Sequence, residues 1–238
     1  MRYGAMVLLL VGSLFVCTDA AAQTVLGVSS GLYLEDGRLH AKQKMGDQEE
    51  QDQSYDFRPD NFLSGSLWFL LQLSPRLRVG SDLEYMGTYA SLTRPTEQQR
   101  QQPNFEPRRF EFGRLLEFYG RFEFLVPALP NVDLILGAAV GMPFLFPRGD
   151  LKNDIEDLQD RGAAVWKVPR TGYLVGPMLS GRWKYDEHLY LRSDLQMKWE
   201  QIFVYRTSGG LDDGTSFTRR WTTGSLRYQV NFAIEVLL

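Results

Sequence analysis

The chain has 238 residues, with 26 lysines and arginines against 29 aspartates and glutamates, and a formal net charge of −3. This mild charge balance argues against a nucleic-acid partner, and the length suits one domain. The slightly negative mean hydropathy does not exclude a membrane protein, because a membrane β-barrel carries its apolar residues only at every second position.

The first segment has the features of an export signal. Arg2 precedes an apolar run over residues 6–16, and three alanines at 20–22 precede Gln23. This order is typical of a secretory signal peptide, and the run is too short to cross about 30 Å of hydrocarbon as a helix. We therefore expect a signal peptide at residues 1–22.

Cys17 is the only cysteine and leaves a second interpretation open. Bacterial lipoproteins are cut just before a cysteine that is then acylated, but Val16 stands where such signals usually carry a small residue. We expect Cys17 to leave with the signal. Residues 23–238 would then form the mature chain, a single domain without thiol chemistry.

After the signal, apolar and polar residues alternate over many segments, as where Leu83 lies between Asp82 and Glu84. Alternation with a period of two indicates β-strands. Four segments are weaker because their second face is small or mixed, and Arg114 is the one charged residue on the apolar face of its segment. In chain order the expected strands are residues 24–34, 62–73, 77–89, 109–126, 132–146, 171–185, 188–205 and 226–238.

The connections between these strands alternate in length. Short turns are expected at 74–76, 128–131 and 186–187, and long polar loops at 35–61, 90–108, 147–170 and 206–220. Short periplasmic turns and long extracellular loops are typical of outer-membrane barrels. In the third loop, Leu151, Ile155 and Leu158 recur at helical spacing, which predicts an amphipathic helix that serves as a lid on the barrel rim or binds a partner.

The same alternation would also fit a soluble barrel with its apolar face inward. Eight strands leave an interior that side chains only just fill, and each clear strand carries on the order of six large apolar residues, too many for that space. The apolar face is therefore expected to meet lipid. Aromatic belts are expected at both interfaces: Tyr85, Tyr89, Phe110, Phe112, Phe144, Phe146, Tyr173, Phe203 and Tyr205 toward the loops, and Phe124, Trp183 and Tyr185 opposite.

The pattern resembles that of the small eight-stranded outer-membrane proteins of the OmpA, OmpX and OmpW type, over the whole mature chain. The resemblance implies an all-β fold, an eight-stranded antiparallel up-and-down transmembrane β-barrel in the bacterial outer membrane. The last strand of such proteins usually ends in an aromatic residue read by the assembly machinery. This chain alternates through Tyr228, Phe232 and Ile234 but ends in Leu238.

Inward positions of the expected barrel carry charges of both signs. A narrow barrel cannot keep such charges far apart, and buried charges are costly unless paired, so we expect salt bridges that plug the lumen. The predicted charge network consists of Arg78, Asp82, Glu84, Glu111, Glu117, Arg121, Arg182, Arg192, Asp194, Lys198, Glu200 and Arg227. Further inward positions are Arg109, Glu123, Asp133, Lys184 and Glu235.

Catalytic and metal-binding sets are not found in the sequence. The two histidines, His40 and His188, fall on opposite sides of the expected membrane and cannot serve one site. The acidic run Asp212–Asp213–Gly214 lacks EF-hand spacing and is interpreted as a solvated loop. We therefore expect no enzyme activity, no cofactor and no metal.

Three functions remain, in this order: a structural or surface-interaction barrel with a plugged lumen, a narrow channel for small or hydrophobic solutes, and a lipid-modifying enzyme. The expected partners are outer-membrane lipid and lipopolysaccharide, together with the assembly machinery. The chain is expected to be a monomer.

Overall fold

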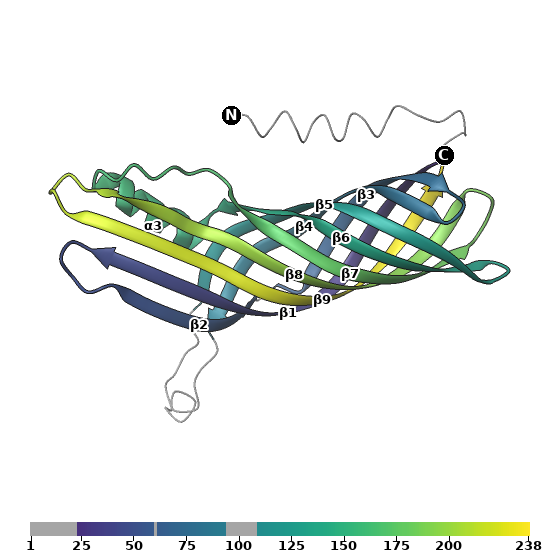
Figure 1. The fold of residues 1–238 in the computed structure, drawn as a ribbon, viewed down its shortest axis with the longest axis horizontal. Helices are drawn as coiled ribbons and strands as arrows, with labels where there is room; N and C mark the ends of the chain where they lie inside the picture. The colour runs from purple at the N-terminus through teal and green to yellow at the C-terminus, as the bar shows by residue number, and fades with distance from the viewer. Residues whose placement is uncertain (1–22, 60, 94–108) are drawn as a thin grey trace, which may run out of the picture.

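The computed structural model describes residues 23–59, 61–93 and 109–238, which wind into an elongated barrel with one short helix (Figure 1). The predicted signal peptide and most of the predicted second loop lie outside the described residues. The elements are β1 (Gln23–Met45), β2 (Gln51–Pro59), β3 (Leu63–Ser74), β4 (Leu77–Thr93), β5 (Arg109–Leu129), β6 (Val132–Pro147), α3 (Gly149–Asp160), β7 (Arg170–Lys184), β8 (Leu189–Gly210) and β9 (Ser216–Leu237).

The barrel closes through eight strand positions. β1 pairs with β3 on one side and with β9 on the other, and all neighbouring strands are antiparallel. β2 continues the position of β3 toward the long loops, because it also lies between β1 and β4. β2 and β3 are thus two segments of one strand, and the predicted eight-stranded up-and-down barrel is confirmed.

The barrel is apolar outside and charged inside. Leu195 and Phe232 face outward and are 53% and 67% exposed, whereas Arg227 and Glu117 are fully buried in the interior. A soluble barrel has the reverse arrangement, and a continuous band of exposed large apolar side chains is the surface that faces lipid. The chain is therefore a transmembrane barrel of the outer-membrane type. Among the described residues, no helix has the length and apolar character needed to cross a membrane.

The two ends of the barrel differ, as predicted. The short turns between β3 and β4, β5 and β6, and β7 and β8 lie at one end, the short-turn end, where Val25 of β1 also pairs with Leu237 of β9. The other end, the loop end, carries α3 and the long hairpins (Figure 1). In outer-membrane barrels the short turns are periplasmic, so the loop end faces outward from the cell.

The prediction of long loops at 35–61 and 206–220 is wrong in extent. β1 continues to Met45 and stays paired with β9 as far as Phe217, so only 46–50 and 211–215 are turns. The sequence of these segments resembles that of polar loops, because beyond the membrane the outer face of a strand meets water and also carries polar residues. Gly46, with φ of +55°, lies in the first of these turns.

Bulges overturn the predicted lipid-facing position of several aromatic residues. A bulge adds one residue to a strand and so reverses the face of every residue beyond it. The β4–β5 register shifts around Gly87 and again after Tyr89, and the β8–β9 register shifts before Tyr205. As a result Tyr89, Phe112 and Tyr205 point into the barrel and are at most 1% exposed.

These inward residues build a hydrophobic cluster at the loop end, and α3 closes it. Leu151, Ile155 and Leu158 of α3 are buried in the cluster, so the predicted helix is confirmed and packs as a lid. The buried members of the cluster are Tyr33, Met86, Tyr89, Phe112, Leu115, Leu145, Leu151, Ile155, Leu158, Ala163, Val165, Ile202, Val204, Tyr205, Leu211 and Phe217. Arg114 stays outside, exposed and paired in register with Thr88 and Phe146 near the loop end.

Candidate functional site

Most of the predicted lumen residues lie inside the barrel, between the short-turn end and the hydrophobic cluster. Those that are buried there are Arg78, Asp82, Glu84, Glu117, Arg121, Arg182, Arg192, Asp194, Lys198, Glu200 and Arg227. Glu123 and Glu235 are buried among them, and Asp133 is partly buried. Lys184 is exposed at the end of β7.

The prediction that Glu111 and Arg109 face the lumen is wrong. The shift in register near Gly113, whose φ is +146°, reverses the start of β5, so Arg109 and Glu111 lie on its outer side. Glu111 pairs there with Arg109 at 3.4 Å, and its backbone N–H donates to Asp150 of α3.

The half of the lumen nearer the short turns holds the lower network, which is centred on Arg192. Its guanidinium contacts carboxylate oxygens of Glu123 at 2.8 Å, Asp194 at 2.5 Å and Glu235 at 2.6 Å. These partners come from β5, β8 and β9, so a single arginine ties different walls of the barrel together. Arg78 reaches Glu235 as well, at 3.3 Å.

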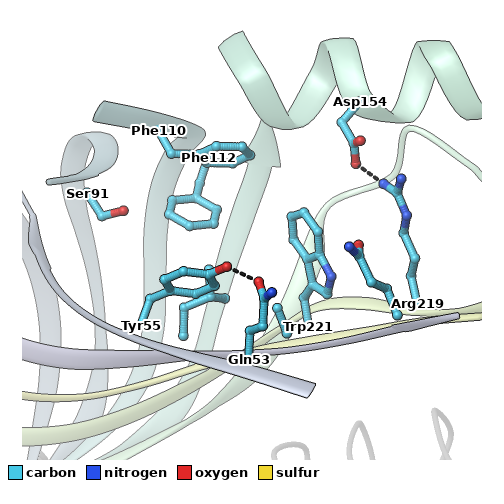
Figure 2. Close-up of a pocket in the computed structure, with 11 residues that line it drawn as sticks. Gln53, Tyr55, Ser91, Phe110, Phe112, Asp154, Arg219 and Trp221 are labelled. Atoms are coloured by element: carbon cyan, nitrogen blue, oxygen red, sulfur yellow. Dashed lines mark hydrogen bonds and ion pairs between the residues drawn. The ribbon is translucent and has the colours of Figure 1, made fainter. Parts of the chain in front are cut away.

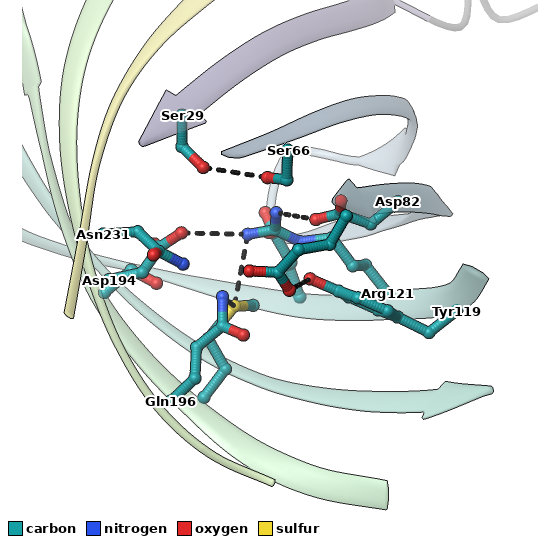
Figure 3. A network of polar contacts seen from close by, with 12 residues as sticks. Ser29, Ser66, Asp82, Tyr119, Arg121, Asp194, Gln196 and Asn231 are labelled. Carbon is teal, nitrogen blue, oxygen red and sulfur yellow. Dashed lines mark hydrogen bonds and ion pairs between the residues drawn. The ribbon is translucent and has the colours of Figure 1, made fainter. Parts of the chain in front are cut away.

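Arg121 extends the lower network across the lumen. It lies between Asp82 at 2.8 Å and Asp194 at 3.3 Å, from β4 and β8 respectively (Figure 3). Its guanidinium also lies over the ring of Trp68, 4.5 Å from the centroid. Arg182 completes the network through Asp133 at 2.8 Å. The planar guanidinium suits such multiple contacts because it presents five donors in a fixed geometry.

The upper network lies between the lower network and the hydrophobic cluster. The carboxylate of Glu117 forms ion pairs with both cations of this network, Arg227 and, at 3.2 Å, Lys198. Arg227 also reaches Glu35 at 3.0 Å and Glu200 at 3.3 Å.

Carboxylates outnumber cations in the upper network. Lys198 and Arg227 face Glu35, Glu84, Glu117 and Glu200, all buried. Neutral hydroxyl groups donate hydrogen bonds to some of the carboxylates that exceed the cations in number. Tyr89 donates to Glu35 at 3.1 Å, and Tyr119 donates to Glu84 at 3.1 Å. No donor among the described residues reaches one oxygen of Glu200, Oε1.

At the loop end an open cavity of about 370 Å³, the mouth pocket, lies beside α3 (Figure 2). Aromatic rings form much of its wall, with the centroids of Phe110 and Phe112 4.8 Å apart and Trp221 edge-on to Phe110. Its lining residues are Leu39, Ala41, Gln43, Gln53, Tyr55, Ser91, Phe110, Phe112, Asp154, Arg219 and Trp221.

The polar side of the mouth pocket is formed by contacts between the lid helix α3 and the barrel wall. Asp154 of α3 pairs with Arg219 of β9 and accepts a hydrogen bond from Tyr205 at 2.7 Å. On the opposite side Tyr55 donates to Gln53. The pocket thus combines flat apolar walls with amide, carboxylate and guanidinium groups, the usual lining of a small-molecule site.

The chain matches no protein-family profile and no curated protein sequence. Solved structures with a similar fold include OprG from Pseudomonas aeruginosa, with 11% identity, a TM-score of 0.45 and coverage of 90% of this chain and 96% of that one. The Escherichia coli outer-membrane protease OmpT has 8% identity, a TM-score of 0.43 and coverage of 94% and 99%. Neisserial surface protein A has 13% identity, a TM-score of 0.34 and coverage of 85% and 97%. These are similarities of fold alone.

Sequence reasoning missed several lumen residues, of which Glu35 is the most important. The first strand was expected to end at residue 34, although the alternation of β1 continues without a break through Glu35 to Ala41. Tyr33 was missed because the inner face of its strand before it is small, with Gly27, Ser29 and Gly31. The signal that identifies Glu35 is its place in the odd-numbered series that follows Val25.

The remaining candidates stay separate from both networks. His40 lies on the outer side of β1 and is hydrogen-bonded to Ser54, while His188 lies in the turn before β8. Asp213 accepts the backbone N–H of Thr215 at 2.8 Å, which lowers the pKa of its carboxyl and stabilises the turn. Within the described ranges, acidic and histidine side chains form no cluster suited to a metal ion.

Proposed function

We propose that the protein is a surface-interaction barrel of the outer membrane, with a lumen closed to hydrophilic solutes and a mouth pocket open to the outside. The observation that carries this proposal is the set of ion pairs that join opposite walls, such as Arg121 with Asp82 on one side and Asp194 on the other. Above these pairs, the hydrophobic cluster and α3 fill the interior. The mouth pocket is then a cavity that an extracellular ligand can reach.

Conductance tests the closed lumen. Purified protein in planar bilayers is expected to show little current, whereas Arg192→Ser combined with Glu235→Ser removes a cation and an anion from the lower network and should raise it. The double change keeps the net charge and removes a pair in contact at 2.6 Å. Large, stable single-channel currents from the unmutated protein would reject the proposal in favour of a narrow channel.

Ligand arrays test the surface role. Detergent-purified protein is expected to bind members of an array of extracellular peptides and glycans, and the combined change Gln53→Ala and Trp221→Ala should abolish that binding, because both side chains line the mouth pocket. The Arg192→Ser, Glu235→Ser protein is the matched control and should still bind. Binding that the pocket changes leave intact, or no binding by any protein, would contradict the assignment of this pocket.

A further inference from the structure

Three basic residues lie in register on the outer surface of neighbouring strands. Lys42 of β1 is paired with Arg220 of β9, and Arg220 is paired with Arg206 of β8. All three are exposed and lie on the outer sides of their strands. Because neighbouring strands are about 4.8 Å apart, this outer cationic row spans roughly 10 Å.

The bulge in β8 is what completes the row. Up to Phe203 the odd-numbered residues of β8 face outward, and after the register shift between Phe203 and Tyr205 the even-numbered Arg206 does so. The same bulge therefore sends Tyr205 into the hydrophobic cluster and places Arg206 beside Arg220.

An aromatic group on the outer wall lies directly below Arg206. The guanidinium carbon of Arg206 is 3.5 Å from the ring centroid of Phe203. The Phe203 ring is 6.0 Å from that of Tyr173, which in turn is 5.4 Å from that of Trp199. Exposed aromatic residues at the edge of an apolar band mark the level of the lipid headgroups. Arg206 is thus directed at the headgroup layer, and the row faces sideways along the membrane surface.

The charge of the row is largely unbalanced within the part of the chain that the structure describes. Lys42 is paired with Asp52 at 2.7 Å, whereas among the described residues no carboxylate lies within 4.0 Å of the guanidinium groups of Arg206 and Arg220. Like charges directly opposite each other on neighbouring strands destabilise a sheet. An anion between the two arginines would turn this repulsion into attraction, and guanidinium groups bind phosphate with two parallel hydrogen bonds.

We propose that Arg206 and Arg220, the two cations of the row that have no carboxylate partner among the described residues, bind a phosphate group of a lipid in the outer leaflet. The lateral orientation of the row, at the level of the aromatic group, favours a lipid phosphate over a soluble anion. The site is separate from the mouth pocket, which lies on the inner side of the same strands, so it does not depend on the proposed closed lumen.

Lipid binding by purified protein tests this site. Fluorescent lipopolysaccharide is titrated against the unmutated protein and against Arg206→Gln with Arg220→Gln, using native and enzymatically dephosphorylated lipid. The double change is expected to weaken binding of the phosphorylated lipid about tenfold or more, because charge-assisted hydrogen bonds are lost. Binding of the dephosphorylated lipid should be weak and equal for both proteins. Higher salt should weaken only the phosphate-dependent part.

Arg38→Gln is the matched control, because Arg38 also lies on the outer side of β1 but is paired with Asp56 at 2.9 Å. It should bind like the unmutated protein, and the heat-dependent gel shift should be the same for all variants. Equal affinities of the double variant and the unmutated protein would overturn the proposal. Loss of lipid binding in millimolar inorganic phosphate, but not in sodium chloride of equal ionic strength, would also overturn it, since that result indicates a site for soluble anions.

Discussion

At the residue scale, the carboxylates of the upper network contribute unequally to the stability of the barrel. Glu117 forms ion pairs with both cations, whereas Glu200, among the described residues, forms an ion pair with Arg227 alone and leaves one oxygen without a donor. Removing one partner of a buried ion pair leaves a charge that neither water nor protein compensates. Removing a carboxylate that is in excess relieves repulsion between like charges. The two glutamates therefore differ in their expected contribution to stability, although both are buried.

Glu117→Gln is expected to lower the free energy of unfolding by about 3 kcal/mol, because Lys198 and Arg227 both lose a carboxylate partner. Glu200→Gln should change it by less than about 1 kcal/mol. Urea unfolding of the protein refolded in detergent, followed by tryptophan fluorescence, measures both values. Equal losses for the two variants would show that the excess of carboxylates has no energetic consequence.

At the element scale, the sequence predicted the strands well where the wall is regular and poorly where a bulge interrupts it. Leu83 and Phe118 follow the alternation and lie on the lipid face as expected. Tyr89 and Tyr205 do not, because one extra residue in β4 and one in β8 reverse the faces beyond it. A single glycine such as Gly87 does not identify a bulge in advance, since many strand glycines are regular. The loop-end cluster and the mouth pocket, which depend on these bulges, were therefore not predictable.

The lid helix α3 offers a test at this scale. Glu156 accepts a hydrogen bond from Lys167 at 2.5 Å, which lowers the pKa of its carboxyl and ties α3 to the segment before β7. Because the folded pKa lies below that of the unfolded chain, about 4.3, the contact stabilises the lid at higher pH and is lost as pH falls through the folded value.

Hydrogen–deuterium exchange of the α3 amides is therefore expected to be faster in Glu156→Gln than in the unmutated protein at pH 6. The ratio of the two rates should approach one as pH falls through the folded pKa of Glu156, which lies below the unfolded value of about 4.3. Comparison at each pH removes the intrinsic pH dependence of exchange. A ratio that stays constant over this range, or equals one throughout, would show that the Glu156 contact does not hold the lid.

At the scale of the whole molecule, the distribution of polarity is reversed relative to a soluble protein, so its stability depends on where a new charge is placed. Inside the barrel, an added charge lies beside the charged groups of the lower and upper networks. Outside, near the middle of the apolar band, it meets hydrocarbon. Toward the ends of the strands it reaches headgroups and water, where the cost of a cation falls to about 0–1 kcal/mol.

Leu195→Arg and Phe118→Arg place a cation on the lipid face, where the two side chains are 53% and 48% exposed. Each is expected to destabilise the barrel by roughly 2–4 kcal/mol in lipid. Leu129→Arg is the matched control, because Leu129 is also exposed and apolar but ends β5 at the short turn. Folding into vesicles, followed by the gel shift between unheated and heated samples, should drop for the first two variants and persist for the third. In detergent micelles, which adapt to a charged side chain, the difference should shrink. Equal folding of all three variants in vesicles would mean that the band does not face lipid, and the membrane assignment would fail with it.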